Sequence, residues 1–134
     1  MRAVAAVLAA AAVLTGCGLN VASPDLFQVI RTGQGRTLSL VVNDGGTITC
    51  NGGKPEPLPD ALLLQARDLS TNLNDDAKAK LRFPAGVGSV FSYTVKVQNG
   101  TFTFPDTAAG SRKELSRLEL FVVQAAADPC GISA

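Results

Sequence analysis

The chain of 134 residues has no histidine, no tryptophan and a single tyrosine. Without histidine it has neither a Ser-His-Asp triad nor an imidazole general base or metal ligand. With so little tyrosine and tryptophan, flat aromatic platforms for sugars or nucleobases are not expected. Twelve Lys and Arg against eleven Asp and Glu leave a net charge of +1. The basic excess typical of nucleic-acid binding is therefore missing, and we expect no nucleic-acid partner.

The N-terminus combines a short basic start with an apolar segment. Met1 and Arg2 precede an unbroken apolar run from Ala3 to Leu14. A membrane-spanning helix needs about 20 such residues, so this run is too short to cross a bilayer. The pattern instead predicts a secretory signal peptide over residues 1–16.

The residues that follow the apolar run, Leu14-Thr15-Gly16-Cys17, resemble the lipobox of bacterial lipoproteins. The resemblance implies cleavage between Gly16 and Cys17 and attachment of a diacylglycerol, with acyl chains such as palmitate, to the Cys17 thiol. Two or more acyl chains anchor a protein stably. Residues 17–25, small and polar after the cysteine, would then form the tether. We therefore expect a protein anchored on the extracytoplasmic side of the cell membrane.

Two cysteines, Cys50 and Cys130, remain once Cys17 is assigned to the lipid. In an exported chain the oxidising compartment favours a disulfide between them. A catalytic or metal-binding pair is the other interpretation, but the chain has no CxxC spacing and no histidine. The sequence therefore predicts a Cys50–Cys130 disulfide and neither a metal site nor a cofactor.

Alternating apolar and polar residues predict an antiparallel sheet. Turn-forming residues Asn43-Asp44-Gly45-Gly46 and Asn99-Gly100 separate paired segments and predict two hairpins. The strands are expected at residues 26–32, 37–41, 47–50, 91–98 and 101–104, with a loop at 51–57.

The second hairpin carries the strongest alternation. With Asn99-Gly100 at its tip, Val97 would lie opposite Phe102 and Val95 opposite Phe104. These four side chains are expected in the core.

Two segments have helical spacing. Apolar residues recur every three or four positions over 59–74, and a charged connection is expected at 75–85. A capping box, Ser111-Arg112-Lys113-Glu114, predicts the start of a second helix. Its continuation over 115–126 also fits a strand around 118–124, and we prefer the helix because of the cap. Asp128-Pro129 would end it next to Cys130.

Together these elements predict a single α+β domain over residues 26–134. It would consist of an antiparallel sheet of two hairpins plus an N-terminal strand, with two helices packed on one face. Hydrophobic residues make up 46% of the chain and charged residues 17%, a composition typical of a folded domain.

Few segments resemble a catalytic, metal-binding or phosphate-binding motif. Asp75-Asp76 could supply half of a Ca²⁺ site, but the EF-hand pattern is absent and a solvated helix end explains the pair more simply. Asn51-Gly52-Gly53-Lys54 lacks the spacing and the Ser or Thr of a phosphate-binding loop. Neither an S-x-x-K nor a G-x-S-x-G motif occurs in the chain, so no catalytic serine is indicated.

The order of elements over 26–70 and 90–104 resembles the small secreted subtilisin-inhibitor family. That family presents a reactive loop just before a comparable hairpin. The resemblance places the loop at Lys80-Leu81-Arg82-Phe83-Pro84 and implies protease inhibition through it.

Taken together, the sequence favours a non-catalytic envelope module. Its membrane contact would be the lipid on Cys17, and its folded domain would bind another envelope protein or a small apolar ligand. The alternatives are a protease inhibitor acting through residues 80–84 and a hydrolase whose site carries no familiar motif.

The N-terminal analysis gives a direct prediction. Mass spectrometry of the protein purified from membranes should find Cys17 as the first residue, carrying a diacylglyceryl group. A Cys17→Ser variant should lose the lipid mass and leave the membrane fraction. A chain that starts at Met1 or Ala3, or an unmodified Cys17 thiol, would contradict the prediction.

Overall fold

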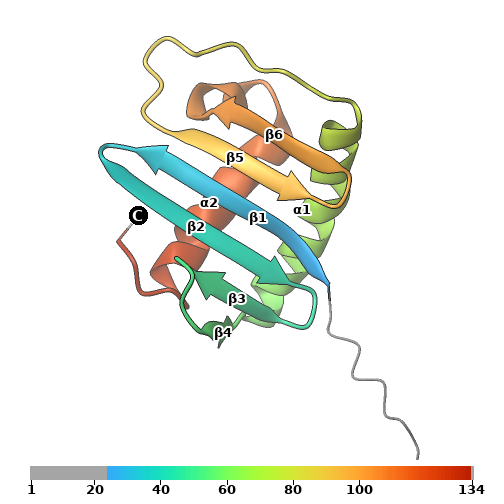
Figure 1. Cartoon of the computed structure of the whole chain (residues 1–134), viewed down its shortest axis with the longest axis vertical. Helices are drawn as coiled ribbons and strands as arrows, with labels where there is room; N and C mark the ends of the chain where they lie inside the picture. The colour runs from blue at the N-terminus through green and yellow to red at the C-terminus, as the bar shows by residue number, and fades with distance from the viewer. Residues whose placement is uncertain (1–23, 134) are drawn as a thin grey trace, which may run out of the picture.

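An open antiparallel sheet of six strands carries two helices on one face in the computed structural model, which describes residues 24–133 (Figure 1). The predicted signal peptide and Cys17 lie outside the described residues. The strand order is β4-β3-β2-β1-β5-β6. The strands are β1 (Asp25–Gly33), β2 (Arg36–Asn43), β3 (Thr47–Cys50), β4 (Pro55–Pro57), β5 (Ser92–Val97) and β6 (Gly100–Pro105). The helices are α1 (Asp60–Lys78), the short 3-10 helix η1 (Asp106–Gly110) and α2 (Lys113–Ala127). The predicted α+β class is confirmed.

Two turns connect the three strands of the N-terminal half, and the one predicted at residues 43–46 forms as the sequence indicates. At the β1–β2 turn, Gln34 and Gly35 take φ angles of 52° and 70°, a conformation that glycine adopts readily. At the β2–β3 turn, the Asn43 side-chain oxygen accepts a hydrogen bond from the Gly45 N–H at 2.8 Å. The Asn43 carbonyl accepts another from the Gly46 N–H at 3.0 Å. Asn43 thus closes the hairpin from both its side chain and its backbone.

The register of the β5–β6 hairpin differs from the prediction. Val95 lies opposite Phe102, Tyr93 opposite Phe104 and Val97 opposite Gly100, so the tip is Gln98-Asn99. A contact with α1 accompanies this register, because the Asn99 N–H donates to the Asn74 side-chain oxygen at 2.9 Å. The shift is by two residues, so the side chains keep their faces. Three of the four expected core residues are buried, whereas Val97 is only partly buried.

Two element boundaries also differ from the predictions. Within the expected loop 51–57, Pro55–Pro57 pairs with β3 as the short strand β4. The prolines fit there because an edge strand leaves some backbone positions without a ladder partner. Helix α1 extends through Lys78, beyond the predicted end at residue 74. The charged residues of its last turn belong to the predicted connection 75–85. In the structure this turn is helical, and its residues Asp76 and Ala77 are buried.

An ion-pair cluster explains why α1 continues and why the predicted capping box is wrong. Asp76 is only 4% exposed and accepts a hydrogen bond from the Arg112 guanidinium at 2.7 Å, so it is not a solvated helix end. Arg112 also pairs with Glu114 at 2.8 Å. Glu114 therefore does not reach back to cap α2, and the Ser111 hydroxyl donates to the Ala108 carbonyl at 3.0 Å instead. The cluster joins the end of α1 to the start of α2.

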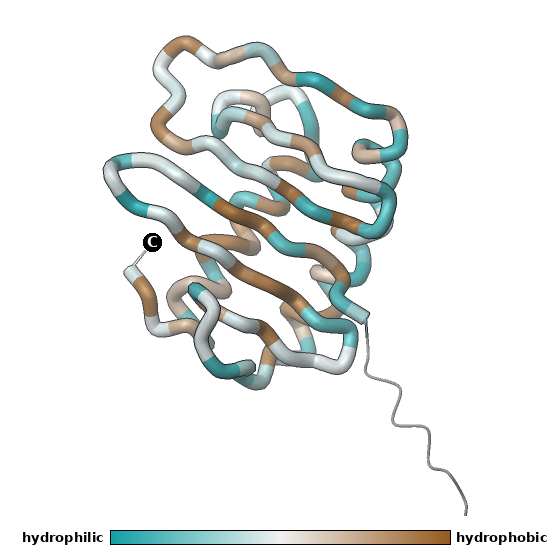
Figure 2. The backbone as a smooth tube through the Cα atoms, in the orientation of Figure 1, coloured by the Kyte–Doolittle hydropathy of each residue, from teal (hydrophilic) through white to brown (hydrophobic). Residues whose placement is uncertain are grey.

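The core lies between the sheet and the two helices. Residues 115–126 are helical, as preferred, and apolar side chains of α2 meet those of β1: the Phe27 and Phe121 rings contact edge to face at 5.6 Å. Figure 2 shows the hydrophobic segments concentrated in the central strands and in the helices behind them. The opposite face of the sheet is covered by no described helix and is rich in threonine: Thr32, Thr49, Thr94 and Thr103.

The predicted disulfide is present and joins the end of β3 to the segment after α2. The Cα atoms of Cys50 and Cys130 are 5.8 Å apart and close a sequence separation of 80 residues. Beyond Cys130, the Ile132 N–H donates to the Ala126 carbonyl at 2.7 Å, which folds the C-terminal segment back beside α2. The disulfide therefore fixes this segment over one end of the sheet.

Removing this crosslink should destabilise the domain. A Cys50→Ala/Cys130→Ala double variant should lose about 2–4 kcal/mol of unfolding free energy, since a long loop is freed in the unfolded chain. Urea denaturation measures the loss, and Cys17→Ser, which keeps the disulfide, is the control. A double variant as stable as the control would show that the crosslink does not stabilise the fold.

Candidate functional site

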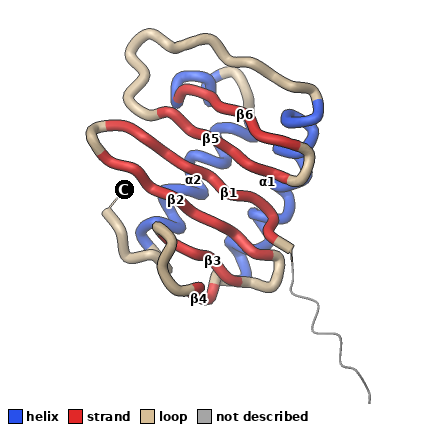
Figure 3. The backbone as a smooth tube through the Cα atoms, viewed as in Figure 1, coloured by secondary structure: helices blue, strands red, loops and turns tan. Residues whose placement is uncertain are grey.

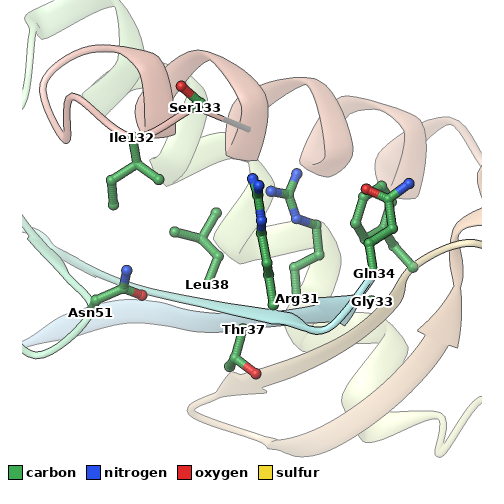
Figure 4. Close-up of a pocket in the computed structure, with 10 residues that line it drawn as sticks. Arg31, Gly33, Gln34, Thr37, Leu38, Asn51, Ile132 and Ser133 are labelled. Atoms are coloured by element: carbon green, nitrogen blue, oxygen red, sulfur yellow. The ribbon is translucent and has the colours of Figure 1, made fainter.

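A pocket of about 330 Å³ opens at the end of the sheet where β1 turns into β2. Its floor is the β1–β2 hairpin, and its other walls come from the start of the β5 segment, the residue after β3 and the C-terminal segment (Figure 4). The lining residues are Arg31, Gly33, Gln34, Arg36, Thr37, Leu38, Asn51, Phe91, Ile132 and Ser133. The volume lies within the range of small-molecule sites.

Arg31 stands at the centre of this pocket and is only 9% exposed. The alternation of β1 places it on the helix-covered face with Phe27 and Val29, and in Figure 4 its side chain rises from the sheet toward α2. Its guanidinium carbon lies 4.7 Å from the centre of the Phe91 ring, a cation–π contact. Among residues 24–133, no Asp or Glu forms an ion pair with Arg31.

A second arginine reaches the same pocket from the neighbouring strand. Arg36 lies opposite Gly33 in the β1–β2 register and, like Leu38 two residues later, projects from the helix-covered face. Gly33 has to be glycine here because a Cβ atom would overlap the Val90 carbonyl oxygen and lie 2.6 Å from the Phe91 ring. The close approach brings Phe91 to the pocket wall.

Asp106 holds the Phe91 wall in place. Its carboxylate accepts hydrogen bonds from the Ser89 hydroxyl at 2.6 Å and from the backbone N–H groups of Val90 and Phe91, each at 3.0 Å. Burial acts to raise the pKa of Asp106, but these hydrogen bonds outweigh it and lower the pKa. The ionised carboxylate thus fixes the loop that enters β5.

The opposite wall depends on the disulfide. Asn51 directly follows Cys50, and its side-chain oxygen accepts a hydrogen bond from the Ser39 N–H at 2.8 Å, which leaves its NH₂ group as the donor at the pocket. Ile132 follows Cys130 closely and faces Leu38 across the space, whereas the Thr37 side chain points to the other side of the sheet (Figure 4). Asn51 and Ile132 are thus both tied to the crosslink.

Behind the pocket, two titratable groups face each other across the core. Burial is the main cause that raises the pKa of Tyr93, and the nearby Glu119 carboxylate adds to it, while Arg31 acts in the opposite direction. Burial, and to a lesser extent the charge of Asp106, raises the pKa of Glu119 to about 7. Glu119 Oε1 is buried and has no hydrogen-bond partner among the described residues.

The predicted reactive loop, residues 80–84, lies away from this pocket in the long connection between α1 and β5 (Figure 3). Its side chains alternate: Lys80 and Arg82 are exposed, whereas Leu81 and Phe83 are partly buried. The Phe83 ring packs against Phe102 and Phe104, with centroid distances of 6.4 and 6.1 Å. A shallow hollow of about 720 Å³ is lined by residues of the loop and of β6.

The remaining candidates are not brought together in a site. In the part of the chain that the structure describes, no group of cysteines and carboxylates is placed to hold a metal ion. Asp76 of the Asp75-Asp76 pair is used in the ion-pair cluster with Arg112. Within residues 24–133, no helix is both long and apolar enough to cross a membrane.

The pocket itself was not predicted from the sequence. One signal for it exists: in the strand 26–32, an arginine takes the position on the apolar face where Phe27 and Val29 predict another core residue. A charged residue in that position needs a partner or an opening to solvent.

Comparisons with known proteins do not identify the chain. No family model, no curated protein and no solved structure matches it.

The raised pKa of Glu119 predicts how stability depends on pH. In the unfolded chain the carboxyl ionises near its ordinary value of 4.5, whereas in the fold it ionises near 7. The stability that comes from the protonated form is therefore fully present below about pH 4.5 and is lost as the pH rises through 7. Glu119→Gln, which stays neutral, should be more stable than the wild type at pH 8 by about 1–2 kcal/mol, after allowance for solvent screening.

Urea denaturation at pH 5 and pH 8 measures this difference. Glu56→Gln, on the exposed strand β4, is the matched control and should follow the wild type at both pH values. If Glu119→Gln and the wild type show the same change between pH 5 and pH 8, the Glu119 carboxyl is not the group responsible.

Proposed function

We propose that this chain is a lipid-anchored, extracytoplasmic binding module whose domain binds a small molecule without transforming it. The observation that carries the proposal is the pocket at the β1–β2 end of the sheet, with Arg31 buried in it. A pocket with fixed walls and few convergent polar groups is typical of ligand sites. The lipobox-like residues at Leu14–Cys17 support the anchor.

The placement of the pocket fits this arrangement. The described chain enters the sheet at Asp25, and β1 runs from there to Gly33 at the pocket. A strand of nine residues spans about 30 Å, so Asp25, where the described chain enters the sheet, and the pocket lie at opposite ends of β1 (Figure 1). An anchor on Cys17 would leave the pocket open to the side away from the membrane.

The chemistry of the wall supports binding over catalysis. Its ten residues include neither a carboxylate nor a cysteine, and the chain has no histidine. A hydrolytic mechanism would need a general base within hydrogen-bond reach of a nucleophile or a water. The hydroxyl of Ser133 has no such base beside it in the wall.

Protease inhibition through residues 80–84 has weaker support. Arg82 is exposed between two partly buried neighbours, as a residue offered to a protease would be. However, the loop has one side-chain anchor, Phe83, and the Cys50–Cys130 disulfide lies at another part of the fold. An inhibitor gains affinity from a loop held rigidly in its bound conformation.

Fragment binding observed by NMR tests the proposed pocket. Neutral and charged fragments are added to the exported Cys17→Ser chain, and the amide signals of Gln34, Asn51 and Ile132 are followed. Dissociation constants on the order of 1 mM are expected for such small probes. Ser133→Trp, which places a large ring at the exposed rim, should weaken binding at least about tenfold.

Ser116→Trp, at an exposed position of α2 outside the pocket, is the matched control and should bind as the parent does. If no fragment shifts the three amide signals, or if Ser133→Trp binds as tightly as Ser116→Trp, the pocket is not a ligand site.

A further inference from the structure

The described residues of the pocket wall are rich in hydrogen-bond donors and include no acidic side chain. Arg31 and Arg36 approach it from adjacent strands, and the side-chain amides of Gln34 and Asn51 border it. None of its ten lining residues is Asp or Glu. Among the described residues that line this space, a ligand therefore meets two positively charged side chains and no negatively charged one.

From this we infer that the pocket binds an oxyanion, a carboxylate or a phosphate, joined to a small apolar body. The inference rests on the proposed function of the pocket and names the chemistry of its ligand. Guanidinium groups bind both anions through pairs of parallel N–H bonds. The oxyanion would lie between Arg31 and Arg36, with the apolar body between Leu38 and Ile132.

The burial of Arg31 is the first argument. A charged group taken out of water is costly unless it is paired. The Phe91 ring covers one face of the guanidinium at 4.7 Å, and the Tyr93 hydroxyl lies within hydrogen-bond reach of it, but both groups are neutral and leave the positive charge without an opposite charge. Since no carboxylate of residues 24–133 pairs with Arg31, an anionic ligand would supply the missing charge.

The use of acidic residues elsewhere is the second argument. Three arginines of the described chain pair with carboxylates: Arg67 with Asp44 and Arg117 with Asp68, and Arg112 with Asp76 and Glu114. Arg31 and Arg36 instead line the same pocket from adjacent strands, where like charges repel. An oxyanion between them changes this repulsion into two attractions.

The shape and polarity of the walls restrict the rest of the ligand. Leu38 and Ile132 face each other in one part of the pocket (Figure 4), and Phe91 lines it beside Arg31. These apolar side chains would exclude a fully hydrated ion and favour a hydrocarbon group attached to the anion. Asn51 lies on the far side of Leu38 from Arg31 (Figure 4), so its NH₂ group, free of the bond that its oxygen makes to Ser39, can donate to a polar atom at the other end of the ligand.

The test compares probes that differ in charge but have the same ring. Benzoate, phenyl phosphate and the neutral benzamide are titrated into the exported Cys17→Ser chain, and the amide signals of Gln34, Asn51 and Ile132 are followed. At least one of the two anions should bind about tenfold or more tightly than benzamide. Raising the salt concentration should weaken the binding of the anions and leave the binding of benzamide unchanged.

Variants of the two arginines assign the effect. Arg36→Gln lies at an exposed position where folding is not at risk. It should lower the affinity for the anions about fivefold or more without changing the affinity for benzamide. Arg31→Lys keeps the charge but loses the planar fork, and should also lower the affinity for the anions. Arg82→Gln, in the loop 80–84 outside this pocket, is the matched control and should bind as the parent does.

The outcomes separate the two proposals. If benzamide binds as tightly as both anions, or if Arg36→Gln and Arg31→Lys bind the anions as the parent does, the oxyanion inference is wrong while the pocket remains a ligand site. If neither the anions nor benzamide shifts the signals, both the proposal that the pocket is a ligand site and the oxyanion inference are wrong. Sedimentation with phosphatidylglycerol vesicles identifies the source of the anion: binding that Arg36→Gln abolishes indicates a lipid headgroup, and its absence alongside small-anion binding indicates a free solute.

Discussion

The most constrained position in this fold is Arg31, a charged residue on the apolar face of the central strand β1. Up to Val29 that face is covered by the helices and packs as a hydrophobic core. At Arg31 the core has to end, because a guanidinium cannot be surrounded by hydrocarbon without a partner. The walls around it are accordingly an aromatic ring, amide groups and a space that solvent or a ligand can enter. The pocket is thus the place where the core meets a buried charge.

Two different clamps keep the walls of that space in place. On one side, Asp106 accepts three hydrogen bonds from the segment that leads into Phe91: one from the Ser89 hydroxyl and two from the backbone N–H groups of Val90 and Phe91. On the other, the Cys50–Cys130 disulfide connects the residue before Asn51 with the segment that carries Ile132. Both clamps act on segments that lie outside regular helices and strands, where the backbone would otherwise be free to move. The pocket walls are therefore set before any ligand arrives, which reduces the ordering cost of binding.

The sequence predicted the features that depend on local pattern and missed those that depend on contacts between distant segments. Alternation identified β1, β2, β3, β5 and β6, and helical spacing identified both long helices, because these periodicities reflect one buried face. The capping box failed because the Glu114 carboxylate pairs with Arg112, which also binds the distant Asp76. The hairpin register shifted by two residues where Asn99 bonds to Asn74. Strand β4 has no alternating pattern of its own, since its three residues are all exposed.

Composition also conceals how charge is distributed in the fold. A net charge of +1 argues against a broad basic surface for nucleic acid, yet it says nothing about a single pocket. In the structure, arginines such as Arg67 and Arg117 find carboxylates at or near the helix surfaces, whereas Arg31 and Arg36 share a wall without one. A nearly neutral chain can thus contain a locally positive site, because its acidic residues are used elsewhere. The pairing of strands β1 and β2 places these two arginines, five positions apart in sequence, at one pocket. Only the fold shows that the described residues lining this pocket include no Asp or Glu.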